Sequence, residues 1–269
     1  MRTKGRSRLS GTRIAWCLFR AREGTGVDMK LKKCKYSIQE KKDVSLELGI
    51  PYVNSWEHDV DWIDSSTVVT DRDGKLVAAS ANDKAEEVVE QGEKGEITLY
   101  PWFQQLAVAF QTRGPLRAAV TVKFCRKVTM RVAERDLPEE LGSYPLSDRQ
   151  EVNGVNLLGA FFVRYLEDGD LRLRVEAALQ NASDTVVERC VLRANLLGPD
   201  GRAIADSEAD DPILPWAVNA MTTDFCDLKK GKLKDARIQL WLDMYFAIAS
   251  KTVDAEISKS KDDDDDDES

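Results

Sequence analysis

Histidine is almost absent from the sequence, because His58 is the sole histidine among 269 residues. A single imidazole cannot supply a histidine-based zinc site, a Ser-His-Asp triad or a Cys-His dyad with a residue to spare. The glycine-rich phosphate-binding motifs and the GxSxG nucleophile elbow are also missing. The sequence therefore predicts no enzymatic activity, no cofactor and no metal, and His58 is interpreted as a solvated residue of a polar turn.

The segment "TDRDGK" (70–75) has the clustered acids and the glycine of a calcium loop. If Gly74 were the turn glycine of such a loop, the first ligand would fall on Val69 and the bidentate acid on Ser80. Neither residue is a carboxylate. We therefore interpret the acids of this segment as hairpin-turn residues.

Two other segments hold paired acids, "HDVDWID" (58–64) and "EADDP" (208–212). We expect them in solvated loops. Loop carboxylates can also meet in space to bind calcium, and a carboxylate pair can hydrolyse a glycosidic bond. A calcium- or carbohydrate-binding domain and a carboxylate-based hydrolase are therefore kept as alternatives.

Long hydrophobic runs are absent, and none approaches the roughly 18–20 residues that a membrane-spanning helix needs. The apolar core "IAWCLF" (14–19) is shorter than the roughly 7–15 residues of a secretory signal. The sequence therefore predicts no membrane span, and a disordered basic arm over residues 1–30. An over-extended reading frame upstream of Met29 and an organellar transit peptide are the alternatives.

Cysteine occurs five times but never as a CxxC pair. An odd number at wide spacing is typical of neither a disulfide framework nor a zinc knuckle. We expect most cysteines to be buried thiols of a reducing compartment, and hence a cytoplasmic protein. A single bridge, Cys125–Cys226 or Cys34–Cys190, is the alternative.

Apolar residues alternate with polar ones over residues 120–132 and 238–248. A period of two is typical of a half-buried strand, because successive side chains point to opposite faces. Similar patterns, and turn residues between them, predict strands near 34–39, 44–53, 60–70, 75–80, 96–100, 106–110, 118–133, 155–165, 171–180, 186–197, 202–207, 213–218, 221–228 and 236–249. A short helix is expected over 82–91.

The sequence also repeats itself, because residues 46–80 can be laid on residues 173–207 without a gap. Asp-Gly between two apolar runs predicts a hairpin with a type I′ turn in both copies. A Pro-Trp pair recurs further along each copy. The repeated positions are Asn54/Asn181, Val60/Val187, Asp73/Asp200, Gly74/Gly201, Ser80/Ser207, Pro101/Pro215 and Trp102/Trp216.

These patterns predict an all-β chain of two tandem antiparallel β-sandwich domains that arose by internal duplication. In strand count and spacing the domains resemble immunoglobulin-like sandwiches, although the Cys…Trp…Cys core of antibody domains is missing. A single larger sandwich or barrel is the alternative. The predicted order is a basic arm, domain 1, a linker, domain 2 and an acidic disordered tail, over residues 1–30, 31–135, 136–154, 155–257 and 258–269.

The charge is concentrated at the two ends of the chain, whose net charge is -8. Residues 1–33 carry ten Lys and Arg. The acidic body disfavours direct nucleic-acid binding, because it repels phosphate. The tail is predicted to attract basic protein partners, with a purely solubilising role and a contact with the basic arm as alternatives. Its acids are Asp262, Asp263, Asp264, Asp265, Asp266 and Asp267.

Tryptophan marks two kinds of candidate position. Trp102 and Trp216 recur in both copies and are expected to be core anchors. Trp241 and Tyr245 share the polar face of their predicted strand. They are predicted to form a partner-binding patch, or to cover the other domain.

The sequence thus predicts a non-enzymatic interaction protein, or in a sharper form a chaperone-like protein whose acidic tail engages cationic partners. A structural or cell-surface adhesion protein is the alternative from another class.

Overall fold

The computed structural model describes residues 27–29, 33–39, 42–55, 59–81, 90–147, 149–226, 228 and 233–259. Most of them lie in β-strands, so the predicted all-β class is confirmed. No helix within these ranges is long and apolar enough to cross a membrane. The basic arm as far as residue 26, the six tail aspartates, His58 and most of the expected helix over 82–91 lie outside the described residues.

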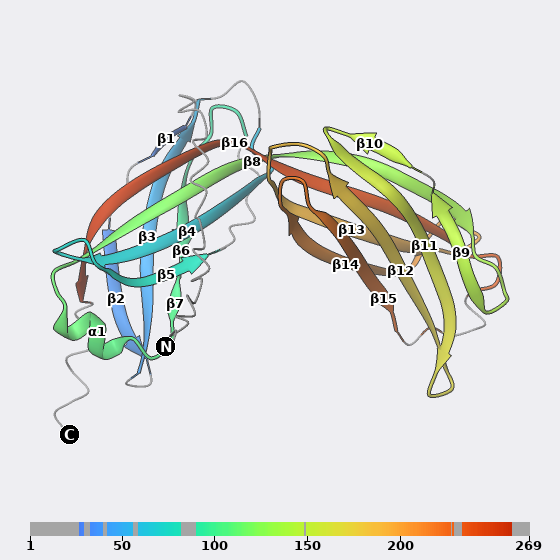
Figure 1. Ribbon diagram of the computed structural model, residues 1–269, viewed down its shortest axis with the longest axis horizontal. Coiled ribbons are helices and arrows are strands. Elements are labelled where there is room, and N and C mark those ends of the chain that lie inside the picture. The colour runs from blue at the N-terminus through green and yellow to red at the C-terminus, as the bar shows by residue number, and fades with distance from the viewer. Residues whose placement is uncertain are drawn as a thin grey trace, which may run out of the picture.

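The strands form two lobes, joined by two long strands that run through both (Figure 1). The joining strands are β8 (Leu116–Asp136) and β16 (Arg237–Lys259). The N-terminal lobe contains the helix α1 (Ala107–Thr112) and the strands β1 (Val27–Met29), β2 (Lys33–Gln39), β3 (Asp43–Asn54), β4 (Trp62–Asp71), β5 (Leu76–Ala81), β6 (Lys94–Leu99) and β7 (Trp102–Phe103). The C-terminal lobe contains β9 (Gly142–Ser147), β10 (Gln150–Val152), β11 (Val155–Glu167), β12 (Asp170–Asn181), β13 (Val187–Leu197), β14 (Ala203–Ile213) and β15 (Val218–Phe225).

β8 and β16 pair with each other in antiparallel fashion along almost their whole length. The pairing runs from Arg237 opposite Asp136 in the C-terminal lobe to Ile257 opposite Leu116 in the N-terminal lobe. Figure 1 shows the two ribbons crossing the joint together. The lobes are therefore connected by a continuous hydrogen-bonded ribbon.

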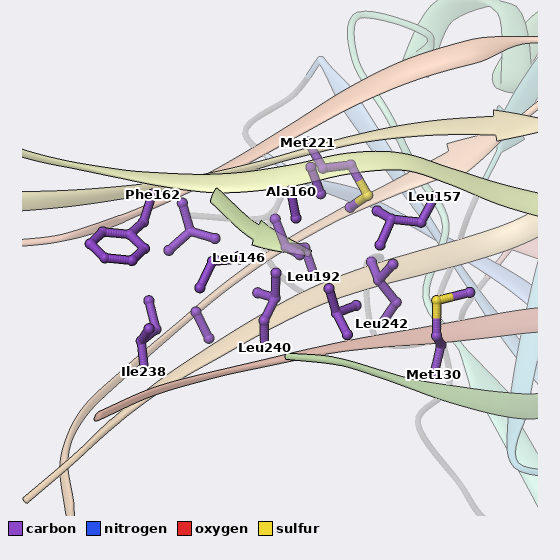
Figure 2. Close-up of a cluster of buried hydrophobic side chains, with 14 of the residues drawn as sticks. Met130, Leu146, Leu157, Ala160, Phe162, Leu192, Met221, Ile238, Leu240 and Leu242 are labelled. Carbon is purple, nitrogen blue, oxygen red and sulfur yellow. The ribbon is translucent and has the colours of Figure 1, made fainter. Parts of the chain in front are cut away.

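The strands belong to two sheets. The larger has 11 strands, in which β1-β3-β2-β16-β8-β4-β5 form the main path, β6 and β7 add to β3, and β13 and β14 extend from β16. The smaller has five strands, with β10-β11-β12-β15 in order and β9 also on β11. In the C-terminal lobe the two sheets pack face to face as a sandwich (Figure 2).

Each lobe encloses its own hydrophobic core. Figure 2 shows Leu157, Phe162 and Met221 of the smaller sheet pointing toward Leu240 and Leu242 of the larger one. A separate cluster fills the N-terminal lobe, and its largest fully buried members include Leu46, Leu48, Ile50, Ile97, Leu116 and Phe124.

Alternation along the strands produces these cores. In β12 every second side chain from Leu171 to Leu179 is buried, and β3 has the same pattern. The strands predicted over 118–133 and 236–249 are confirmed as β8 and β16, although both continue further than predicted. Residues of β8 lie in both cores, and the extra length of β16 carries it further into the N-terminal core, as far as Ile257.

Both predicted Asp-Gly hairpins are present, but the expected turn type is wrong. Gly74 and Gly201 both have φ 78°, whereas Asp73 and Asp200 keep negative φ, and a type I′ turn needs positive φ at both central residues. The Gly74 N–H donates to the Asp71 carbonyl, and the Gly201 N–H donates to the Gly198 carbonyl. Each hairpin is thus a type I turn followed by a glycine bulge.

Asn54 and Asn181 end the strands β3 and β12, and both are fully buried. The Asn181 Nδ2 donates to the carbonyls of Thr185, at 2.7 Å, and of Ile213, at 3.3 Å. The Asn54 Nδ2 donates to the Glu90 carbonyl at 3.1 Å. In both lobes the buried amide thus bonds carbonyls of the adjoining loops.

Three segments differ from the prediction. Residues 106–110 were predicted as a strand but lie at the start of α1, which places Ala107 and Phe110 on the core. Residues 213–218 contain a turn between β14 and β15. The expected linker, residues 136–154, holds β9 and β10, both of which pair with β11.

We predict that Asn181→Ala lowers the free energy of unfolding by about 1–3 kcal/mol, because the carbonyls of Ile213 and Thr185 lose hydrogen bonds from a fully buried amide. Urea unfolding followed by tryptophan fluorescence measures this. The matched control is Asn156→Ala, whose half-buried amide is 3.4 Å from the Gln180 Oε1 and should cost less than about 0.5 kcal/mol. Equal losses in the two variants would contradict the structural role of Asn181.

Candidate interaction site

Trp241 and Tyr245 lie on the outer face of the larger sheet, where both are half-buried. The Arg131 guanidinium lies 5.4 Å from the centre of the Trp241 ring. The Arg189 guanidinium lies 5.8 Å from the centre of the Tyr245 ring. Each aromatic side chain is thus partly covered by a cation from a neighbouring strand.

Between these two aromatics lies Asp243, which is only 3% exposed. Its carboxylate pairs with Arg193 at 2.5 Å and accepts a hydrogen bond from the Thr129 Oγ1 at 2.6 Å. Burial, and after it the charge of Asp243, raises the pKa of Tyr245. Strands β8, β13 and β16 therefore present a linked layer of ion pairs and rings here.

The same layer continues onto β4 at the joint. The rings of Trp62 and Tyr245 are 5.7 Å apart, and Arg189 lies 5.7 Å from the Trp62 ring. Arg189 also pairs with Asp210 at 3.1 Å. The Trp241–Tyr245 patch remains a prediction, and its two rings each pack on a different arginine. The predicted tail residues, 262–267, lie outside the described residues.

Trp102 and Trp216 are not core anchors, so that expectation is wrong. Trp102 is 56% exposed and Trp216 is 69% exposed. They also occupy different places in the topology. Strand β6 pairs with β3 in the same way as β15 pairs with β12, so β6 and β15 are equivalent. Trp102 lies after β6, at the start of β7, whereas Trp216 lies before β15.

The true counterpart of Trp216 in the N-terminal lobe is Gly92. The Ala217 N–H donates to the Leu214 carbonyl at 3.2 Å, and the Glu93 N–H donates to the Glu90 carbonyl at 3.1 Å. In each lobe the buried asparagine at the strand end then donates its own N–H, at 2.9 Å, to the carbonyl of Ala217 or Glu93. The two turns thus share these two backbone hydrogen bonds.

The two turns differ in the polarity of their side chains. Residues 90–94 read Glu-Gln-Gly-Glu-Lys and are all exposed, with Gly92 at φ 78°. Residues 214–218 read Leu-Pro-Trp-Ala-Val, and we call them the apolar turn. There Trp216 takes φ 60°, a conformation that is an outlier for a bulky side chain.

Three large apolar side chains of the apolar turn are exposed to solvent. Leu214 is 62% exposed, Trp216 is 69% exposed and Val218 is 61% exposed. A strained backbone that presents an apolar ring to water is a feature of functional sites. Sequence reasoning missed this site, although an apolar "LPWAV" directly after an acidic strand could have indicated it.

Two open hollows also lie on the surface. One, of about 670 Å³, is on the outer face of the smaller sheet and is lined by Pro145, Leu158, Phe161 and Ala178 among others. The other, of about 590 Å³, lies beside Trp102 and Phe103. Their lining is mainly apolar.

The acidic segments do not assemble a metal site in the part of the chain that the structure describes, because no three His, Cys, Asp or Glu side chains are grouped there. "EADDP" lies entirely in strand β14, not in the expected loop. In "HDVDWID" (58–64) Asp64 is buried, at 5% exposure, and its carboxylate lies 3.8 Å from the Lys123 Nζ.

Four cysteines are free thiols, as expected, and neither alternative bridge is present. Cys34, Cys125 and Cys190 are buried, whereas Cys226 is exposed. Burial raises the pKa of Cys34 and of Cys190 to about 12. These two thiols are therefore protonated at neutral pH and unsuited to act as nucleophiles.

Comparison with known proteins gives no family. No family model matches the sequence, and no curated protein sequence matches it. A solved structure named "pT26-6p" is 6% identical, with 88% of this chain and 67% of that chain covered and a TM-score of 0.22. The sporulation control protein Spo0M from Bacillus subtilis is 13% identical over 56% of this chain and 78% of its own, with a TM-score of 0.20.

Red sea bream transglutaminase is 6% identical, with 87% of this chain and 31% of that chain covered and a TM-score of 0.21. TM-scores this low carry no argument about fold or function.

Proposed function

We propose that the protein is a non-enzymatic protein-interaction module and that the apolar turn is the part that contacts the partner. The observation that carries this proposal is that Trp216 occupies the position at which the other lobe has Gly92. A residue at positive φ costs about 1–3 kcal/mol when it is not glycine. A protein retains this conformational cost where the side chain itself has a role.

Binding is such a role, because burial of an exposed aromatic ring against a partner is favourable. Tryptophan is among the residues that most often dominate binding energy in interfaces. Leu214 and Val218 extend the apolar surface on both sides of the ring. The polar turn of the N-terminal lobe offers no comparable surface.

We also propose that the two lobes are immunoglobulin-like sandwiches that arose by duplication, with domains near 31–135 and 155–257 that exchange the ends of β8 and β16. The matching ends of β3 and β12, the two glycine bulges and the two buried asparagines support this. The free thiols support a reducing compartment such as the cytoplasm. In the proposed duplication, one copy has kept a polar turn and the other presents tryptophan.

Replacing Trp216 with glycine, the residue of the matching turn, should abolish partner binding without unfolding the protein. The free energy of unfolding should stay within about 1 kcal/mol of wild type, because relief of strain offsets the freedom that glycine adds to the unfolded chain. Affinity capture from the source lysate, quantified by mass spectrometry, and urea unfolding measure the two effects.

The control for this experiment is Trp102→Ala, which removes a tryptophan of similar exposure from the N-terminal lobe. Proteins that the wild type and W102A retain, but W216G loses several-fold, would support the proposal. If W216G retained the same proteins in the same amounts, the apolar turn would not be the binding site.

The acidic tail is proposed to strengthen association with basic partners. Replacing Asp262, Asp263, Asp264, Asp265, Asp266 and Asp267 with asparagine should weaken binding to a basic protein such as lysozyme and flatten its dependence on salt. Replacing all six with glutamate, which keeps the charge, should leave both unchanged. Isothermal titration at several salt concentrations tests this, and an unchanged salt slope in the asparagine variant would remove the tail from the mechanism.

A further inference from the structure

The apolar turn is held against a second loop by Asn181. The side-chain amide of Asn181 donates to Thr185 in residues 181–186 and to Ile213, just before the turn. Its backbone N–H donates to the Ala217 carbonyl at 2.9 Å. The Asn181 Oδ1 also accepts hydrogen bonds from the N–H of Ser183, at 3.1 Å, and from its hydroxyl, at 2.8 Å. The two loops therefore form one ordered platform.

The charge of this platform has one sign. Asp184 is exposed at the tip of the first loop, and Asp211 is exposed near the end of β14, three residues before Leu214. Residues 181–186 and 211–218 contain neither lysine nor arginine. The nearest arginine along the chain, Arg189, is 15% exposed at its side chain and pairs with Asp210. An apolar surface is thus flanked by negative charge.

We propose that this platform binds a cationic peptide segment of a partner protein, in which an apolar side chain packs on Trp216 while flanking lysines or arginines face Asp184 and Asp211. This inference depends on the proposed function, because it names the partner chemistry of the same turn. The apolar contact supplies most of the affinity, and the two carboxylates supply the selectivity for positive charge.

Other occupants are opposed by the same charges. A second copy of this chain, docked turn to turn, would bring the aspartates of both copies together, and like charges in an interface are unfavourable. An anionic lipid surface or a nucleic acid would place phosphates beside Asp184 and Asp211. A cationic segment is the chemistry that removes both the exposed apolar area and the uncompensated charge.

The test uses three fluorescein-labelled peptides with the full-length protein and fluorescence anisotropy. GRKLWRKG has the proposed chemistry, GEELWEEG keeps the apolar pair with the opposite charge, and GRKSSRKG keeps the charge without the apolar pair. We expect GRKLWRKG to bind most tightly. Trp216→Gly should weaken its binding by about tenfold or more, as for an interface hot spot.

The charge is tested with Asp184→Asn/Asp211→Asn, which should weaken binding of GRKLWRKG several-fold at about 50 mM salt and have little effect at about 500 mM, where charges are screened. The matched control is Asp168→Asn/Asp170→Asn. It makes the same change of net charge in the hairpin between β11 and β12. This hairpin lies at the end of β12 opposite to Asn181 (Figure 1), so the variant should leave binding unchanged.

The outcomes separate this inference from the proposed function. If the wild type bound GRKLWRKG and GEELWEEG equally tightly and Trp216→Gly weakened both, the apolar turn would remain a binding site and the cationic partner would be wrong. If the Asp168/Asp170 variant lost as much affinity as the Asp184/Asp211 variant, the selectivity would come from net charge and the inference would also fall. If Trp216→Gly weakened no peptide, both proposals would fail.

Discussion

The antiparallel pairing of β8 with β16 is the constraint on which the rest of the structure depends. The two strands pass from one core to the other while they remain hydrogen-bonded to each other. In the C-terminal lobe β16 also pairs with β13, which pairs with β14. In the N-terminal lobe β8 pairs with β4, which pairs with β5. A chain whose lobes share a ladder in this way cannot rotate one lobe freely about a flexible hinge, because rotation would break backbone hydrogen bonds.

This frame fixes where the candidate site lies. β12 ends at a buried asparagine, whose hydrogen bonds hold the loops on both sides of β13 and β14. The apolar turn is therefore presented by an ordered scaffold, and little chain entropy has to be lost when a partner binds. The polar turn at Gly92 shows that the scaffold does not need an aromatic residue there. In the proposed function, the tryptophan is kept at this position because a partner contacts it.

Part of this was readable from the sequence. The alternation in residues 118–133 and 236–249 predicted strands because it reflects which side chains meet a core, and the Asp-Gly pairs marked two hairpins. The short apolar segment at 106–110 was misjudged, because a run of that length fits a buried helix as well as a strand. The continuation of β8 and β16 into a second core could not be read, since alternation shows burial but not which core is covered. Nor does a sequence show that Trp216, and not Trp102, sits at a positive φ.

Amide hydrogen exchange across the joint tests the shared ladder most directly. Residues 125–127 of β8 and 245–247 of β16 pair with each other and lie between the buried residues of the two cores. If the ladder is continuous, their amides should exchange as slowly as those of the lobe interiors, in one cooperative unit. Rapid exchange at these residues, with both lobes still protected, would show two independent units on a flexible connection and would contradict the account.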